Sequence, residues 1–434
     1  MGWDFETDRD FQEQLDWIDG FMRTRIEPLD HVLGSPYDVG DARRNALVRP
    51  LQEEVRRRRL WACHLGPELG GPGYGQVKLA LMNEILGRSR FGPTVFGCQA
   101  PDSGNAEILA HFGTPEQKRK WLEPLLANEI VSCFSITEPQ GGADPKVFTT
   151  KAERDGDSYA ITGRKWFASN ARYAAFIIVM AVTDPDAASP YRRMSMFVVP
   201  AGTPGMRIVR NVGFHGEAAD THAYIEFDRA MVPAENMLGG RGEAFAVAQT
   251  RLGGGRIHHA MRTIGEARKA LDMMCARVLS RETQGQRLWE KQMVQERIAD
   301  SWIELEQFRL LVLRTAWLID KHRDYRKVRR DISAVKAAMP KVLHDIAARA
   351  LHIHGSLGIS KELPLADLVM QSFHVGLADG PTEVHKATLV RELLKDYQPE
   401  NGLFPSYHLP ALEERARQLY GDTLDDVAEL GGPA

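Results

Sequence analysis

The arrangement most capable of chemistry is a carboxylate at a chain break, Asp379-Gly380-Pro381, shortly before the last long helical run. Gly380 lacks a Cβ, so the backbone can turn sharply there and let a ligand approach closely. Pro381 fixes its own φ, offers no N–H and disfavours helix at the preceding residue. A carboxylate on such a kink can face a cavity and act as a general base. The alternative is an aspartate in a turn followed by an N-cap at Thr382, which is a common use of these residue types.

Helices precede this stretch in the first third of the chain. Phe11, Leu15, Ile18 and Met22 recur at spacings of three and four, which predicts one apolar helix face. Further helices are expected over 41–60, 77–88 and 105–111. A cap residue and a proline at the start of 114–118 predict that another helix begins there. Residues 1–130 are therefore predicted to form an N-terminal helical domain.

The apolar period then changes to that of strands. Short strand-like runs fall over 130–136, 151–153, 158–162, 176–182, 194–199, 207–212 and 223–227. The Asp155-Gly156 pair is a strong hairpin signal between two of them. Short strands with frequent turn residues predict a middle antiparallel β-barrel domain over 131–238.

Long helical patterns return after Gly239-Gly240, over 242–281, 288–322, 332–354 and 381–395. Short connections between long helices are typical of an antiparallel four-helix bundle. We therefore predict an α+β multidomain protein whose C-terminal bundle spans 239–398. Residues 399–434 follow as an extension, with a loose tail from Gly421 onward.

Composition narrows the class of protein. With 434 residues, 43% hydrophobic and 26% charged, the chain fits a globular protein of two or three domains. A net charge of -3 argues against nucleic-acid binding. The cysteines, at positions 63, 98, 133 and 275, are far apart, which fits a reducing compartment without structural metal or disulfides. With no signal-peptide pattern and no apolar run of membrane-spanning length, a cytoplasmic protein away from membranes is expected.

Several motifs, in this order, resemble the acyl-CoA dehydrogenase superfamily. They are the runs 111–118, 134–144 and 165–170, then 281–285 with Gln292, the run 354–358 and the pair Asp379-Gly380. The resemblance covers residues 8–398 and implies that family's fold of helical, β and four-helix domains. The form Asp-Gly-Pro-x-Glu-Val-His is similar to the branch of family members ten and eleven, whose additional kinase-like domain has no room in this chain.

The resemblance also implies site residues. Asp379 falls where most members carry a catalytic glutamate, Arg256 and Gly380 fall beside the substrate, and Ala143 falls near both substrate and flavin. The implied FAD-binding residues are Phe134, Ile136, Thr137, Gly142, Ala143, Phe167, Ser169, Arg281, Thr283, Gln284, Gln292, His352, Gly355, Ser356, Pro381 and Glu383. Taken singly, each has a plain alternative: Thr137 could end a strand, and Phe167 could be core. Arg281 could be a surface arginine near a helix end, and His352 a packed helix residue.

Departures from the family pattern bear on these assignments. Ala143 replaces a common serine, Phe167 a common tryptophan, and Pro381 a residue whose backbone N–H often serves the cofactor. Asp379 is one methylene shorter than glutamate, so its backbone must lie nearer the substrate. Some members carry the base on the helix that begins near Gly242, but the corresponding position here is Gly255.

The implied reaction removes an α proton and a β hydride from an acyl-CoA thioester, giving a trans-2-enoyl product. Asp379 would take the proton, with its pKa raised by a dry pocket once substrate binds. Flavin N5 would take the hydride, and the Asp379 N–H with a flavin hydroxyl would bind the thioester oxygen. An electron-transferring flavoprotein would then accept electrons. Arg281 would reach the FAD of a neighbouring subunit, which implies a homodimer or homotetramer.

Two other functions stay open at this point. One is a flavin oxidase on the same fold, similar to nitroalkane oxidase, where an aspartate base also occurs. The other is a non-enzymatic, DNA-associated flavoprotein, against which the net charge of -3 weighs.

Overall fold

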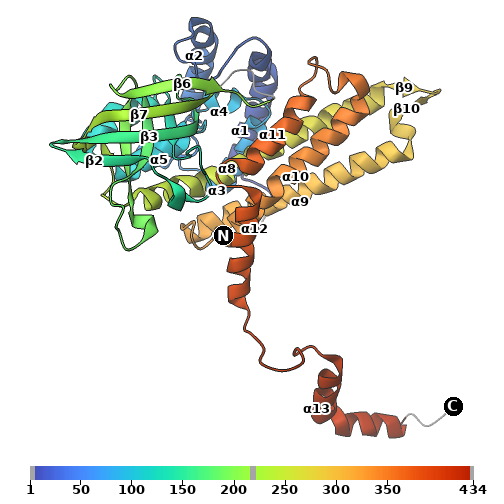
Figure 1. The fold of residues 1–434 in the computed structure, drawn as a ribbon. Helices are drawn as coiled ribbons and strands as arrows, with labels where there is room; N and C mark the ends of the chain where they lie inside the picture. Colours follow the sequence, from blue (N-terminus) through green and yellow to red (C-terminus); the bar gives the residue numbers. More distant parts are fainter. Residues whose placement is uncertain (1–4, 216–220, 431–434) are drawn as a thin grey trace. The chain divides into compact units, whose positions relative to one another are not determined.

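The computed structural model describes residues 5–215 and 221–430, without side chains at 422 and 424–430. Residues 1–389 form one compact unit, and residues 390–434 form another. Figure 1 shows a sheet and a bundle of long helices within the first unit. Among the described residues, no helix is both long and apolar enough to cross a membrane.

The first part of the chain is helical, as predicted. Its helices are α1 (Arg9–Phe21), α2 (Ala42–Arg57), α3 (Gly75–Leu86), α4 (Gly92–Val95), α5 (Asp102–Phe112), α6 (Pro115–Gln117) and α7 (Glu123–Leu126). The helix start predicted at Thr114 is confirmed, because Thr114 Oγ1 accepts from Gln117 N at 3.2 Å and Gln117 Oε1 accepts from Thr114 N at 3.1 Å. This reciprocal pair is a capping box.

The middle of the chain forms an eight-stranded sheet. Its strands are β1 (Ser132–Ser135), β2 (Lys151–Asp155), β3 (Ser158–Ser169), β4 (Phe176–Val182), β5 (Met194–Pro200), β6 (Met206–Val212), β7 (His222–Pro233) and β8 (Met237–Leu238). The order is β6-β7-β3-β2-β4-β5-β8, with β1 paired to β4. The hairpin predicted at Asp155-Gly156 is present between β2 and β3.

A closed antiparallel barrel is the wrong description of this sheet. Strands β6 and β8 stand at opposite ends of the strand order and do not pair with each other. In addition, β1 pairs with β4 in parallel, and one residue pair joins β2 to β4 in parallel. The sheet is therefore open and mixed, since β1 reaches β4 through a crossing segment instead of a hairpin.

Four long helices form the bundle. They are α8 (Ala244–Ser280), α9 (Gln292–His322), α10 (Arg329–His354) and α11 (Leu365–Leu377). A small hairpin of β9 (Glu282–Thr283) and β10 (Gln286–Arg287) joins α8 to α9. The sequence prediction missed α11 and counted the run from Pro381 as the fourth helix. That run is a separate helix, α12 (Thr382–Leu393), because the kink at Asp379-Gly380 divides it from α11.

The extension was also predicted incorrectly. Helix α13 (Leu409–Leu430) includes residues 421–430 of the expected loose tail, and the rest of that tail, 431–434, lies outside the described residues. Residues 409–430 contain helix-favouring Leu, Ala, Glu and Arg, and the single glycine does not interrupt the helix.

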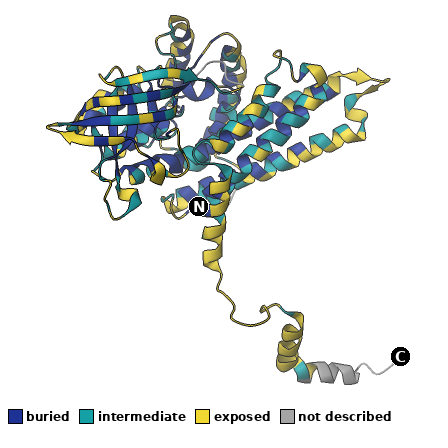
Figure 2. Cartoon of the chain, in the orientation of Figure 1, coloured by how far each residue is buried: buried dark blue, intermediate teal, exposed yellow. Residues whose placement is uncertain are grey.

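Helix α8 connects the packed parts of the first unit (Figure 1). Its start packs with the sheet and α5, where Val247 and Ala248 share a core with Phe176 and Met196. Its later turns belong to the core formed by the N-terminal helices and the other bundle helices. Figure 2 shows buried residues on the strands and on the inner sides of the bundle helices. Residues on α8 can therefore be fixed by contacts with the sheet and α5 at one end and with the other helices at the other end.

Candidate active site

Asp379 lies at the kink between α11 and α12 in a left-handed backbone conformation. Its φ is +56°, and that of Gly380 is +104°. A positive φ is unusual for a residue with a side chain and persists only where its surroundings hold it. Two side chains approach the Asp379 carbonyl oxygen: Arg256 donates from Nε at 3.0 Å, and His385 Nε2 lies at 3.3 Å. The predicted kink is present and is fixed by contacts from α8 and α12.

The Asp379 carboxylate faces α8. Its Oδ1 lies 3.9 Å from Arg251 Nη1, and its Oδ2 lies 3.6 Å from His259 Nε2. A Cβ placed on Gly255 would lie 3.2 Å from Oδ2. The side chain is 17% exposed. The carboxylate is therefore turned into the protein beside a glycine of α8.

The charges around Asp379 lower its pKa. Burial by itself raises it, but His259, Arg251, Arg256 and Lys336 act in the opposite direction and outweigh burial. Burial also lowers the pKa of His259, to about 3, so His259 acts on Asp379 as a cation only well below neutral pH. Near neutral pH, Arg251, Arg256 and Lys336 keep the Asp379 pKa low. The raised pKa predicted from the sequence refers to the substrate-bound state, whereas this lowered pKa belongs to the protein without substrate. The carboxylate is therefore ionised at neutral pH and can accept a proton.

Arg251 connects this carboxylate to the sheet. Its guanidinium lies 4.0 Å from the centre of the Phe134 ring, and its Nε donates to Asn105 Oδ1 at 2.9 Å. Phe134, predicted to contact a cofactor, thus packs against the arginine beside the candidate base.

Hydrogen bonds join the loop after β1 to the end of β3. Lys165 Nζ donates to Ile136 O at 2.9 Å and forms a buried ion pair with Glu138 at 2.9 Å. The next backbone N–H, that of Trp166, donates to Thr137 O at 2.9 Å. These contacts bring Ile136 and Thr137 next to the segment that carries Phe167 and Ser169.

Phe167 and Ser169 lie at the end of β3. Phe167 has a φ of +51° and is 42% exposed. Its ring centre lies 5.4 Å from that of Trp166 and 5.5 Å from that of Phe214. Ser169 Oγ lies 3.0 Å from His222 Nδ1 on β7. Phe167 is therefore an exposed aromatic surface and not the core residue of the alternative interpretation.

The same residues fit a planar, hydrogen-bonding ring. The Thr137 hydroxyl makes no hydrogen bond within the described chain, and the buried Trp166 Nε1 has no partner there. A Cβ on Gly142 would lie 3.1 Å from Thr137 Oγ1, so a glycine lets this loop close over Thr137. Gly142 and Ala143 themselves are exposed. An exposed aromatic face beside unengaged polar groups is what a flavin ring would require.

The remaining candidates lie elsewhere. Arg281, Thr283, Gln284 and Gln292 are exposed around the β9–β10 hairpin. Residues 251 and 281 bracket 30 residues of nearly continuous helix, a separation of about 45 Å at 1.5 Å per residue. His352, 2.9 Å from Arg297, is exposed at the end of α10, as are Gly355 and Ser356. Pro381 is half-buried and Glu383 is exposed. Within one chain, the hairpin residues do not join Asp379.

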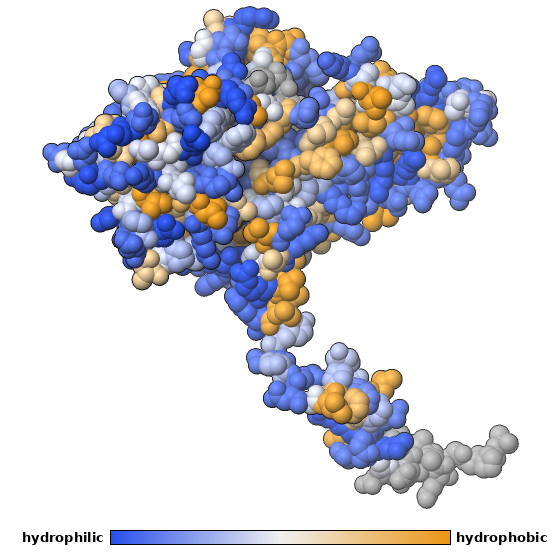
Figure 3. Space-filling view, viewed as in Figure 1, coloured by the Kyte–Doolittle hydropathy of each residue, from blue (hydrophilic) through white to orange (hydrophobic). Residues whose placement is uncertain are grey.

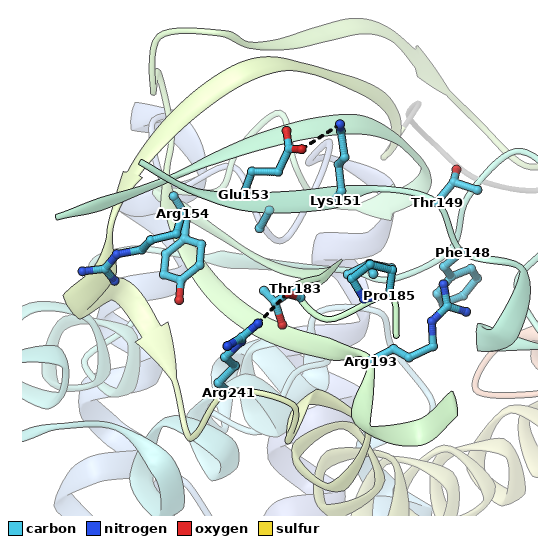
Figure 4. Close-up of a pocket in the computed structure, with 12 residues that line it drawn as sticks. Phe148, Thr149, Lys151, Glu153, Arg154, Thr183, Pro185, Arg193 and Arg241 are labelled. Atoms are coloured by element: carbon cyan, nitrogen blue, oxygen red, sulfur yellow. Dashed lines mark hydrogen bonds and ion pairs between the residues drawn. The ribbon is translucent and has the colours of Figure 1, made fainter. Parts of the chain in front are cut away.

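Two cavities in the described part of the chain are not centred on Asp379. One, of about 750 Å³, lies on the sheet and is lined by Lys151, Arg154, Arg193 and Arg241 among others (Figure 4). Figure 4 shows the Lys151–Glu153 ion pair and the bond from Arg241 to the Thr183 carbonyl at its wall. The other, of about 1190 Å³, includes Glu107 and Tyr325 in its lining.

The residues around Asp379 that the sequence prediction missed are Asn105, Arg251, His259 and Lys336. Each lies in a helical run whose buried face could be read from periodicity, but a polar or ionisable residue at such a position is usually assigned to the surface. The useful signal was the run Gly253-Gly254-Gly255 between Leu252 and Arg256, because three glycines inside a helix leave space for other side chains.

Comparison with known families identifies the class. The chain matches the N-terminal domain of acyl-CoA dehydrogenases over residues 11–129, the middle domain over 133–230 and the C-terminal domain over 242–394. The acyl-CoA dehydrogenase FadE2 of Mycobacterium tuberculosis is 40% identical over 385 residues, covering 85% of this chain and 93% of that protein. This chain belongs to the acyl-CoA dehydrogenase family, whose members are FAD-dependent oxidoreductases.

Individual relatives agree with this placement. Acyl-CoA dehydrogenase family member 11 of Gallus gallus is 38% identical over 403 residues, which are 90% of this chain and 51% of that protein. The chain therefore spans about half the length of this relative. An acyl-CoA dehydrogenase structure from Mycobacterium abscessus is 36% identical with a TM-score of 0.84, covering 91% of this chain and all of that one. Butyryl-CoA dehydrogenase from Megasphaera elsdenii is 26% identical with a TM-score of 0.77, covering 90% and 100%.

Proposed function

We propose that this chain catalyses the α,β-dehydrogenation of an acyl-CoA thioester, with Asp379 as the base that removes the α proton. One observation supports this assignment most directly. Some members that resemble this chain carry their base on this helix, at the position of Gly255. Gly255 lies beside the Asp379 carboxylate, since a Cβ added there would be 3.2 Å from Oδ2. A base on α8 and a base at 379 would therefore serve the same point in space.

The contacts of Asp379 suit a base. Its carboxylate is stabilised as an anion by Arg251, Arg256 and Lys336, so no proton has to leave it before catalysis. The Arg256 bond to its carbonyl oxygen holds the backbone. The Asp379 N–H, on the same kinked backbone, would donate to the thioester oxygen as negative charge develops there.

The cofactor would be held by the loop after β1 and the end of β3. Phe167 would cover one ring face, while Thr137, Ser169 and Trp166 would offer hydrogen bonds. FAD, when bound, supplies the acceptor for the hydride from the β carbon. Ala143 and Gly380 would border the acyl thioester, and Pro381 and Glu383 would border the cofactor.

A second copy of the chain would complete the site. Arg281, Thr283, Gln284, Gln292, His352, Gly355 and Ser356 lie on the bundle away from Asp379 and would reach the FAD of a neighbouring subunit. Figure 3 shows apolar residues gathered on the visible face of the bundle, and Met370, Phe373 and Leu377 of α11 are exposed. Such a face on a helix bundle favours association into a dimer or tetramer. An electron-transferring flavoprotein would be the electron acceptor.

The test is reduction of the flavin by substrate. Purified protein reconstituted with FAD is mixed anaerobically with acyl-CoAs of increasing length and bulk, and absorbance near the flavin maximum is followed. Loss of the yellow colour with at least one acyl-CoA, with formation of a 2-enoyl product, supports the proposal. Colourless protein that takes up no FAD overturns it. Rapid reoxidation by oxygen with peroxide formation would instead favour a flavin oxidase.

A further inference from the structure

We propose that Arg251 is a positioning residue, which holds the Asp379 carboxylate in place as a charged group and is itself held by Gly104, Asn105 and Phe134. This inference rests on the proposed function, because it concerns the residue assigned there as the base. Among the described residues, no other buried charged group contacts both the Asp379 carboxylate and a residue of the sheet.

The arginine is buried and held by three separate elements. Arg251 is 8% exposed. Its Nε donates to Asn105 Oδ1 of α5 at 2.9 Å, its guanidinium lies over the Phe134 ring of β1 at 4.0 Å, and its Nη1 lies 3.9 Å from Asp379 Oδ1. A buried guanidinium is costly unless it is paired and hydrogen-bonded. Its place is therefore set by this surrounding structure.

The surrounding residues are shaped for an arginine at this position. A Cβ on Gly104 would lie 2.9 Å from Arg251 Cγ, so the glycine leaves room for the arginine stem. Asn105 Nδ2 donates to Ser132 Oγ at 2.8 Å, which leaves its Oδ1 directed at Arg251. Helix α5 thus supplies both the space and the acceptor through two consecutive residues.

The contact of Arg251 with Asp379 stabilises the negative charge of the carboxylate without a full hydrogen bond to Oδ1. At 3.9 Å it is an ion pair beyond hydrogen-bond length, so the lone pairs of Oδ1 stay available for a substrate proton. Arg256 and Lys336 act differently, because they donate to the backbone carbonyls of Asp379 and Val375. Among the described cations, Arg251 is the one whose contact is made with the carboxylate itself.

Other titratable groups face this pair and must be considered with it. Arg256 and His259 approach Asp379 from α8, Lys336 from α10 and His385 from α12, while His374 of α11 acts on His259. Asp102 and Glu107 of α5 and Cys133 of β1 face Arg251. Replacing Arg251 removes one positive charge from this set and leaves the others, so the ionisation of Asp379 should then require a higher pH.

The experiment compares Arg251→Gln and Arg251→Lys with Arg268→Gln as a control. Arg268 is another α8 arginine, paired with Glu306 at 2.6 Å and lying 17 positions further along the helix. Flavin content is checked first, and flavin bleaching by acyl-CoA is then measured across pH. We expect the acidic limb of the pH–rate profile of bleaching to move up by about one pH unit in Arg251→Gln. Arg251→Lys should restore its position, and Arg268→Gln should leave it unchanged. Arg251→Met serves as a second neutral variant should Arg251→Gln be recovered without flavin.

A stability cycle gives a measurement that needs no turnover. Unfolding equilibria at neutral pH are compared for Arg251→Gln, Asp379→Asn and the double variant. We expect a coupling of roughly five- to tenfold in the unfolding constant, absent when Arg268→Gln replaces Arg251→Gln. Additive effects together with an unmoved acid limb overturn the role of Arg251 while leaving Asp379 as the base. If no acyl-CoA bleaches the flavin of the unmodified protein, that result would instead count against the proposed function. Coupling between Arg251→Gln and Asp379→Asn in the unfolding measurements would still support the Arg251–Asp379 contact.

Discussion

Arg256 Nε donates a hydrogen bond to the backbone carbonyl oxygen of Asp379 at 3.0 Å. The bond joins α8 to a residue whose φ is +56°, a conformation that needs external support. Arg256 was predicted to orient substrate, and this contact adds a role in holding the backbone of the proposed base. Losing a hydrogen bond to a charged donor costs about 1.5–3 kcal/mol.

The first prediction concerns that bond. Arg256→Gln should retain bound flavin but bleach about 10- to 100-fold more slowly with acyl-CoA, since a misplaced base loses much of its effect. Stopped-flow absorbance of the reconstituted protein measures this rate. An unchanged rate with normal flavin content would remove Arg256 from the support of Asp379.

The second prediction separates stability from activity at Gly255. A Cβ there would lie 3.2 Å from Asp379 Oδ2, so Gly255→Ala should displace the carboxylate by a few tenths of an ångström. Bleaching should slow by about tenfold, whereas helix propensity should add about 0.5–1 kcal/mol to stability.

Gly20→Ala is the matched control for that change. Gly20 lies in α1, and a Cβ there would have nothing within 4 Å. It should gain stability in the same way with an unchanged bleaching rate. Equal rates for Gly255→Ala and the unmodified protein would argue that the carboxylate does not face Gly255 during catalysis.

The third prediction concerns the ion pair beneath the proposed flavin loop. The Lys165 and Glu138 side chains are 0% and 1% exposed and lie 2.9 Å apart. Lys165→Met should lower the free energy of unfolding by about 3–5 kcal/mol, because it leaves a buried carboxylate without its cation. Urea unfolding measures the change.

The exposed pair Lys151–Glu153 provides the comparison. It also spans a distance of 3.0 Å, but its side chains are 52% and 56% exposed. Lys151→Met should cost no more than about 1 kcal/mol. The double variant Lys165→Met with Glu138→Gln should recover part of the loss, and failure to recover any of it would point to a packing defect instead of an unpaired charge.

The fourth prediction is a pH dependence from Glu107. Burial raises the pKa of Glu107 to about 7, with Arg251 acting in the opposite direction. A carboxyl whose folded pKa is raised contributes stability at low pH that is lost as pH rises, here between about 4.5 and 7. Glu107→Gln should abolish this component. Thermal unfolding of both proteins across that window should therefore show the variant gaining relative stability as pH rises; a constant difference would contradict it.

The order of domains could be read from the sequence because each has a distinct apolar period. Periods of three to four residues mark the helices over 8–22 and 242–322, and turn signals such as Asp155-Gly156 mark the strands. Sheet closure could not be read, because it depends on whether the edge strands β6 and β8 meet. Helix α11 was missed because it is a short helix of 13 residues between Pro364 and the kink at Asp379-Gly380.

The candidate base could be located from a local motif, but its surroundings could not. Asp379-Gly380-Pro381 is contiguous, whereas Asn105, Arg251 and Lys336 come from three helices far apart in the chain. The direction of the Asp379 pKa shift in the free protein depends on all these cations together, and none of them could be placed beside Asp379 from the local motif.

The most direct test of the account is α-proton removal by Asp379→Asn. The variant and the unmodified protein are loaded with FAD and mixed anaerobically with an acyl-CoA in deuterated water, and both flavin absorbance and deuterium at the α carbon are followed. We expect that Asp379→Asn keeps its flavin, does not bleach and exchanges no α proton, while the unmodified protein bleaches and exchanges its α proton for deuterium. Bleaching and exchange by Asp379→Asn at the unmodified rate would contradict the assignment of Asp379 as the base.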